Sequence, residues 1–71
     1  MKMPDPILRT LHLPRYDAAL TLERSAMYHK TPYVIMGELH GVKYPERFCS
    51  TEQEAREYLE RVKQTYEAEL Q

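Results

Sequence analysis

Hydrophobic and polar positions follow their clearest pattern near the C-terminus, where the spacing predicts an amphipathic helix over residues 51–69. The apolar residues recur three or four positions apart, so they share one stripe of a helix with 3.6 residues per turn. They are Ala55, Tyr58, Leu59, Val62 and Tyr66. Two possible capping boxes precede this stripe: Gln53 lies three residues after Ser50, and Glu54 lies three residues after Thr51. The helix should therefore begin beside Ser50 and Thr51 and bury its apolar stripe.

Residues 33–49, just before this helix, predict a β-hairpin with a two-residue turn at His40-Gly41. A primed turn of this kind has positive φ, so Gly41 is expected to adopt it. The turn would pair Leu39 with Val42, Gly37 with Tyr44, Ile35 with Glu46, and Tyr33 with Phe48. These residues share one almost wholly apolar face, which is where the helix should pack. The most buried helix residues, Leu59 and Val62, are expected to face Ile35, Leu39 and Phe48.

The opposite face of the hairpin is also rich in apolar side chains. It is expected to carry Val34, Met36 and Glu38 against Lys43, Pro45, Arg47 and Cys49. Val34, Met36 and Pro45 are too apolar to be left bare, so either residues 7–28 or a partner should cover them. Glu38 and Lys43 are expected to form a cross-strand ion pair. Pro45 cannot donate to the hydrogen-bond ladder, so its strand should lie at the edge of the sheet.

The N-terminal half is less clearly patterned. Residues 1–6 contain two prolines and predict an extended lead-in, and the alternation over residues 7–13 is typical of a short strand. Residues 17–28 allow two interpretations. Their composition and a potential N-cap at Asp17 favour a helix, whereas the shared parity of Leu20, Leu22, Ala26 and Tyr28 is a strand pattern.

Together these elements predict a small α+β domain spanning residues 7–71. It should contain an antiparallel β-hairpin or a three-stranded sheet with one C-terminal amphipathic helix on one face. The helix interpretation of residues 17–28, which their composition favours, would add a second helix there. The whole chain has 71 residues, which is room for one hydrophobic core.

Composition adds mainly exclusions. The chain has a net charge of −1, one cysteine and three histidines, without the close ligand spacing of a zinc site. We expect no metal, no cofactor and no internal disulfide. A single thiol without a signal peptide predicts a cytoplasmic protein, and the longest apolar run, residues 33–36, is too short to span a membrane. Cys49 precedes a helix N-terminus, which can lower a thiol pKa, but a semi-buried strand residue is the favoured interpretation.

The residues do not form a recognisable catalytic constellation, so we expect no enzyme. The two glycines are far apart and cannot form a phosphate-binding loop. Four of the six tyrosines are assigned mostly to the core by their parity, which leaves Tyr16 and Tyr28 as interface candidates. The expected function is that of a small regulator or inhibitor that binds another protein or a second copy of itself. Its sheet face and N-terminal half would supply the partner-binding residues Val34, Met36, Lys43, Arg47, Tyr28 and Tyr16. Arg47 is the expected anchor, because arginine is enriched at binding hot spots.

Nucleic-acid binding is the alternative. Its candidate residues are Arg24, Lys30, His40, Lys43 and Arg47. The run GELHGVKYPERFCSTEQEAREYL at residues 37–59 resembles the strand-turn-strand-helix of the small N-terminal DNA-binding domains of phage-type integrases. That resemblance implies a sheet face that contacts DNA. A dense basic face is not expected here, because residues 1–49 hold seven basic side chains against five acidic ones.

Overall fold

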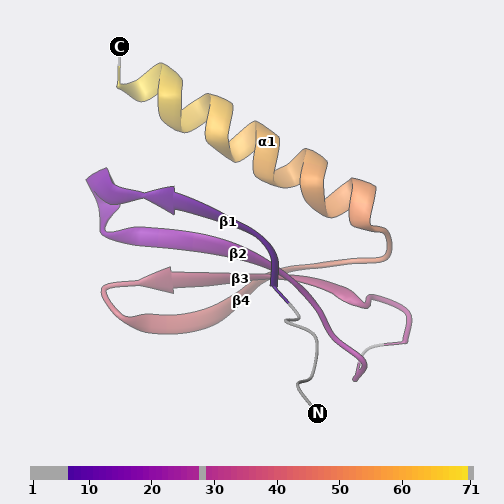
Figure 1. Cartoon of the computed structure of the whole chain (residues 1–71). Helices are drawn as coiled ribbons and strands as arrows, with labels where there is room; N and C mark the ends of the chain where they lie inside the picture. The colour runs from indigo at the N-terminus through magenta and orange to yellow at the C-terminus, as the bar shows by residue number, and fades with distance from the viewer. Residues whose placement is uncertain (1–6, 28, 71) are drawn as a thin grey trace.

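A computed structural model of the chain describes residues 7–27 and 29–70, which form a four-stranded antiparallel sheet with one α-helix across one face (Figure 1). The strands lie side by side in sequence order and precede the helix. They are β1 (Ile7–Leu13), β2 (Ala18–Arg24), β3 (Tyr33–Leu39) and β4 (Val42–Cys49), and the helix is α1 (Glu52–Glu69). The α+β prediction is confirmed, with one strand more than expected. The lead-in predicted for residues 1–6 lies outside the described residues.

The helix favoured for residues 17–28 is wrong, because β2 occupies most of that stretch. β2 pairs with β1 on one side and β3 on the other, so that Leu22 lies between Arg9 and Ile35. Helix propensity differs among ordinary residues by only a few tenths of a kcal/mol, up to about 0.7. Two hydrogen-bonded neighbours and the complete burial of Leu22 outweigh such differences. Asp17 does not cap a helix; it has a φ of 51° after the short 3-10 helix η1 (Pro14–Tyr16).

The turn between β3 and β4 is confirmed as a primed hairpin turn. His40 and Gly41 have φ values of 51° and 83°, and the two predicted pairs nearest the turn, Leu39 with Val42 and Gly37 with Tyr44, are present. Positive φ at both central residues matches the twist of the flanking strands.

A β-bulge at Glu46 changes the register farther from the turn. Met36 pairs with Pro45, but the next residue of β3, Ile35, pairs with Arg47. The predicted pairs of Ile35 with Glu46 and Tyr33 with Phe48 are therefore wrong. An inserted residue moves every later side chain of its strand to the other face.

The bulge exchanges the two faces over the last residues of β4. Cys49 pairs with Tyr33 on the face beneath α1 and is completely buried, and Arg47 also lies on that face. Phe48 pairs with Val34 on the opposite face and keeps 44% of its surface exposed. The predictions that Phe48 joins the core and that Arg47 and Cys49 lie on the far face are corrected.

The core lies between α1 and the strands below it. Leu59 and Ala55 of α1 are fully buried against a cluster that contains Leu22, Ile35 and Cys49. The predicted stripe is confirmed, although Ala55 is more buried than Val62. Leu39, expected beneath the helix, is 42% exposed, because the turn end of the β3–β4 hairpin extends away from α1 (Figure 1).

The start of α1 is capped at Thr51, as predicted, but only the hydroxyl half of the Thr51–Glu54 box is formed. The Thr51 hydroxyl accepts a hydrogen bond of 3.1 Å from the Glu54 amide, and the Ser50 hydroxyl donates to the Glu54 carboxylate at 3.2 Å. Ser50 therefore supports the Thr51 cap and does not form its own box with Gln53. In the described part of the chain, no helix has the length and apolar character needed to cross a membrane.

Gly37 lies beneath the ring of Tyr44, as the predicted pairing requires. A Cβ atom at Gly37 would overlap Cζ of Tyr44, closer than two carbon atoms can approach. Gly37→Ala should therefore displace the ring; because the overlapping atoms are the outer end of an exposed side chain, the free energy of unfolding should fall by only about 1 kcal/mol in urea denaturation. The same change in a Tyr44→Ala background, where the space is empty, should cost much less. Equal costs in the two backgrounds would contradict the proposed contact.

Candidate functional site

The structure divides the predicted partner-binding residues between two surfaces. Val34, Met36 and Lys43 lie on the sheet face opposite α1, which we call the open face. Tyr16 and Arg47 line a groove between α1 and the sheet. The sixth candidate, Tyr28, lies outside the described residues.

The strand register places the apolar residues of the open face side by side on β3 and β4. Val34 lies next to Phe48 in one row, and Met36 lies next to Pro45 in the following row. Val34 is only 4% exposed, Met36 is half-buried, and Pro45 and Phe48 are exposed. The hypothesis that the N-terminal half folds over this face is wrong for residues 7–27, because β1 and β2 lie within the sheet.

Charged and polar side chains border the apolar rows of the open face. Glu38 and Lys43 face each other nearer the turn, but their charged atoms are not within 4.0 Å, so the predicted ion pair is not formed. Glu23 lies beside Val34 on β2, and Thr21 lies beside Met36. The face thus has an apolar centre on β3 and β4 with a polar border.

Both edges of the sheet carry an interruption of the regular ladder. The register of β1 shifts between Ile7 and Arg9, and β4 contains Pro45 and the bulge at Glu46. Such interruptions disfavour the addition of a further strand from another molecule. An approaching protein therefore meets the face of the sheet more readily than its edges.

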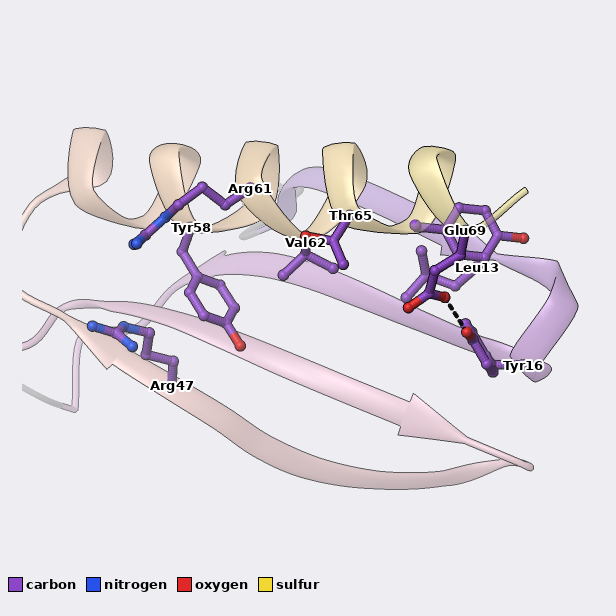
Figure 2. Close-up of a pocket in the computed structure, with 9 residues that line it drawn as sticks. Leu13, Tyr16, Arg47, Tyr58, Arg61, Val62, Thr65 and Glu69 are labelled. Atoms are coloured by element: carbon purple, nitrogen blue, oxygen red, sulfur yellow. Dashed lines mark hydrogen bonds between the residues drawn. The ribbon is translucent and has the colours of Figure 1, made fainter. Parts of the chain in front are cut away.

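The groove on the other side has a volume of about 360 Å³ and runs along α1 (Figure 2). Its apolar part is formed by Leu13 at the end of β1 and by Val62 and the ring of Tyr58 on α1. Arg47 and Arg61 approach one end of it from β4 and α1, while Tyr16 and Glu69 lie at the other (Figure 2). Helical spacing places residues 58, 62, 65, 66 and 69 on the same side of α1.

The bulge at Glu46 organises the arginine end of the groove. It brings both Glu46 and Arg47 to the side of α1, where the Tyr58 hydroxyl donates a 3.0 Å hydrogen bond to the Glu46 carboxylate. The Arg47 guanidinium carbon lies 5.0 Å from the centre of the Tyr58 ring, within cation–π range. Partial burial, followed by the bond to Glu46, raises the pKa of Tyr58, so its hydroxyl stays protonated and donates.

The other end of the groove is formed by contacts between η1 and the last turns of α1. The Tyr16 hydroxyl donates a hydrogen bond to the Glu69 carboxylate, which is the main reason that the pKa of Tyr16 is raised. The rings of Tyr16 and Tyr66 meet edge to face at 5.9 Å. Arg15 adds hydrogen bonds of 3.0 Å to the Tyr66 hydroxyl and to the Glu69 carbonyl. Tyr16 is thus held against α1, where sequence reasoning had not placed it.

Comparison of the chain with protein-family models, curated proteins and solved structures finds no match. The resemblance to the DNA-binding domains of phage-type integrases therefore rests on residues 37–59 alone.

The basic residues proposed for nucleic-acid binding do not form one surface. Arg24 and Lys30 lie at one end of the sheet. His40 lies at the opposite end, in the β3–β4 turn, where its Nδ1 atom is 3.2 Å from the Asp17 carboxylate. Lys43 is on the open face and Arg47 is in the groove. Within residues 7–27 and 29–70, no three His, Cys, Asp or Glu side chains gather into a group that could hold a metal ion.

Cys49 is a buried core residue and not an activated thiol. Burial raises the pKa of the thiol, with a further increase from the nearby Glu54 carboxylate; the Arg47 guanidinium opposes both effects. The interpretation of Cys49 as a strand residue is confirmed, because desolvation dominates over the helix N-terminus.

The raised pKa of Cys49 predicts a loss of stability in alkaline solution. Above the ordinary thiol pKa of 9.0 the unfolded chain releases a proton that the folded chain retains, so the free energy of unfolding falls as pH rises. The contribution is fully present below pH 9.0 and is lost as pH rises through the folded-state pKa. Urea denaturation from about pH 8 to about pH 10 should show a steeper fall for the wild type than for Cys49→Ala. Parallel pH profiles would contradict this assignment.

Proposed function

We propose that this chain is a small non-catalytic protein-binding module that contacts another protein through the open face of its sheet. The observation that carries the proposal is the apolar centre of that face, where the exposed Pro45 and the half-buried Met36 form one row beside the buried Val34. Monomeric proteins rarely expose contiguous apolar patches of more than a few hundred Å² unless the patch has a binding role.

The arrangement of the open face suits a protein partner in particular. Specific interfaces combine an apolar centre with a polar border that orients the partner. Here Glu38, Lys43 and Glu23 supply both signs of charge around the apolar rows. A partner with apolar side chains and a few complementary charges would pack on this face, while the interrupted edges of the sheet disfavour strand addition.

The proposed role is regulation or inhibition of the bound protein by occlusion, without chemistry of its own. A single free thiol suits the proposed cytoplasmic location. A second copy of the chain could occupy the same face, which would make the module a homodimer.

The test is the retention of binding proteins by immobilised wild-type protein and by two variants with the same chemical change. Met36→Glu places a charge on the open face, and Val42→Glu places one on the 67% exposed Val42 beside the turn. Proteins identified by mass spectrometry should be retained by the wild type and by Val42→Glu but not by Met36→Glu. Circular dichroism establishes that each variant is folded, and Lys43→Glu, at an exposed border position, replaces Met36→Glu if that variant is unfolded.

Sedimentation of the same proteins separates the two kinds of partner. A wild-type dimer that Met36→Glu converts to a monomer would identify a second copy of the chain as the occupant. Retention of the same proteins by wild type, Met36→Glu and Lys43→Glu alike would refute binding through the open face.

A further inference from the structure

One end of the groove between α1 and the sheet has two arginines, Arg47 and Arg61, that lack an acidic partner in the described part of the chain. Neither Arg47 nor Arg61 has a carboxylate oxygen within 4.0 Å among the described residues. By contrast, Arg9 pairs with Glu60 at 3.3 Å, and Arg56 pairs with a carboxylate on its own helix. The carboxylate nearest in sequence to Arg47, that of Glu46, is engaged by the Tyr58 hydroxyl.

The surroundings of Arg47 hold its guanidinium in place without neutralising it. The Tyr58 ring lies beneath it at 5.0 Å, and the same ring forms part of the apolar lining of the groove. One side of the Arg47 guanidinium hydrogen-bonds the Cys49 thiol, and its remaining N–H donors are those that can match the oxygens of a carboxylate. Arg61 approaches the same end of the groove from α1 (Figure 2).

The rest of the groove specifies what should accompany that carboxylate. The half-buried Val62 and the ring of Tyr58 offer an apolar surface next to the arginine end, whereas Leu13, which is only 9% exposed, lies nearer Tyr16 and Glu69 (Figure 2). At about 360 Å³ the groove is within the range of ordinary ligand sites. Glu69 gives the far end the opposite charge, so an acidic ligand group is attracted to one end and repelled from the other.

We propose that this groove binds a short segment of a partner protein in which a hydrophobic side chain is adjacent to an aspartate or glutamate. The acidic side chain is bound by Arg47 and Arg61, and the hydrophobic side chain packs on Val62 and the ring of Tyr58. The site is on the side of the sheet opposite the open face, so it is a second, independent binding surface.

The probe is a pair of short fluorescent peptides, acetylated and amidated at their ends, in which leucine is followed by aspartate or by the isosteric asparagine. A second pair carries the two residues in the reverse order. Binding is measured by fluorescence anisotropy. Of the two aspartate peptides, the one whose residue order binds more tightly should have an affinity at least about tenfold higher than the asparagine peptide of the same order, as expected for a charge-assisted hydrogen bond. Added salt should reduce the difference.

Variants of the exposed arginines test the assignment. Arg47→Gln and Arg61→Gln should each remove most of the preference for aspartate. Arg56 lies on α1 with Arg61 but outside the groove, so Arg56→Gln should leave the preference unchanged. Met36→Glu should also leave it unchanged, so failure of the open-face proposal is distinguishable from failure of this one.

Three results would overturn the proposal. They are the absence of peptide binding at millimolar protein, equal affinity for the aspartate and asparagine peptides, and a preference that persists in Arg47→Gln. Binding of a short oligothymidylate that requires both arginines, with no binding of either peptide, would assign the groove to nucleic acid instead.

Discussion

Leu59→Ala should lower the free energy of unfolding by about 2–5 kcal/mol, a large share of the roughly 4–10 kcal/mol expected for a domain of 71 residues. Leu59 is completely buried where α1 meets the sheet, in the same cluster as Leu22 and Ile35. Its truncation removes apolar contacts and leaves a cavity that the surrounding strands cannot easily fill, because they are held by their hydrogen-bond ladders. Thermal and urea denaturation measure the change.

Gln64→Ala is the matched control for Leu59→Ala. Gln64 lies on the exposed side of α1, so its truncation should change the free energy of unfolding by no more than about 0.5 kcal/mol. Equal effects of the two substitutions would show that α1 packs on the sheet through a different side.

Leu22→Lys should prevent folding altogether. Leu22 is fully buried in the second strand of the sheet, with paired strands on both sides and α1 above it. A lysine there has no acidic partner among the described core residues, and an unpaired buried charge costs several kcal/mol. That cost, added to the lost packing of leucine, is comparable to the total stability. We expect a circular dichroism spectrum of an unfolded chain at room temperature.

Thr21→Lys, one residue earlier, is the control that distinguishes a strand from a helix. Adjacent residues of a strand point to opposite faces, so a lysine at position 21 lies on the open face and extends into solvent. This variant should unfold cooperatively within about 1 kcal/mol of the wild type. If Thr21→Lys is unfolded and Leu22→Lys is folded, the faces of β2 assigned here are reversed.

The clearest sequence signals concern elements whose residues interact locally. The cap at Thr51, the apolar stripe with Leu59, and the turn at His40-Gly41 all depend on residues within a few positions of one another. Each of these predictions is confirmed. The contact of Tyr44 with Gly37 was also predictable, because it is separated from the turn by only a few regular pairs.

The strand β2 was not predictable in the same way. Its local composition favours a helix, and the strand forms because β1 and β3 satisfy its backbone on both sides while α1 covers Leu20 and Leu22. None of these neighbours is apparent from residues 17–28 alone. Tertiary contacts therefore outweigh a difference in propensity that amounts to only a few tenths of a kcal/mol per residue.

The sequence by itself determined the α+β class, the primed turn and the buried stripe of α1, because short-range periodicity and capping specify them. Only the tertiary structure decided the strand at β2 and the face on which each residue beyond Pro45 lies. The bulge at Glu46 is one inserted residue in a continuous alternating pattern, and without the partner strand nothing in that pattern locates it. That one residue turns Arg47 from the open face into the groove, and so separates the two surfaces proposed here for binding.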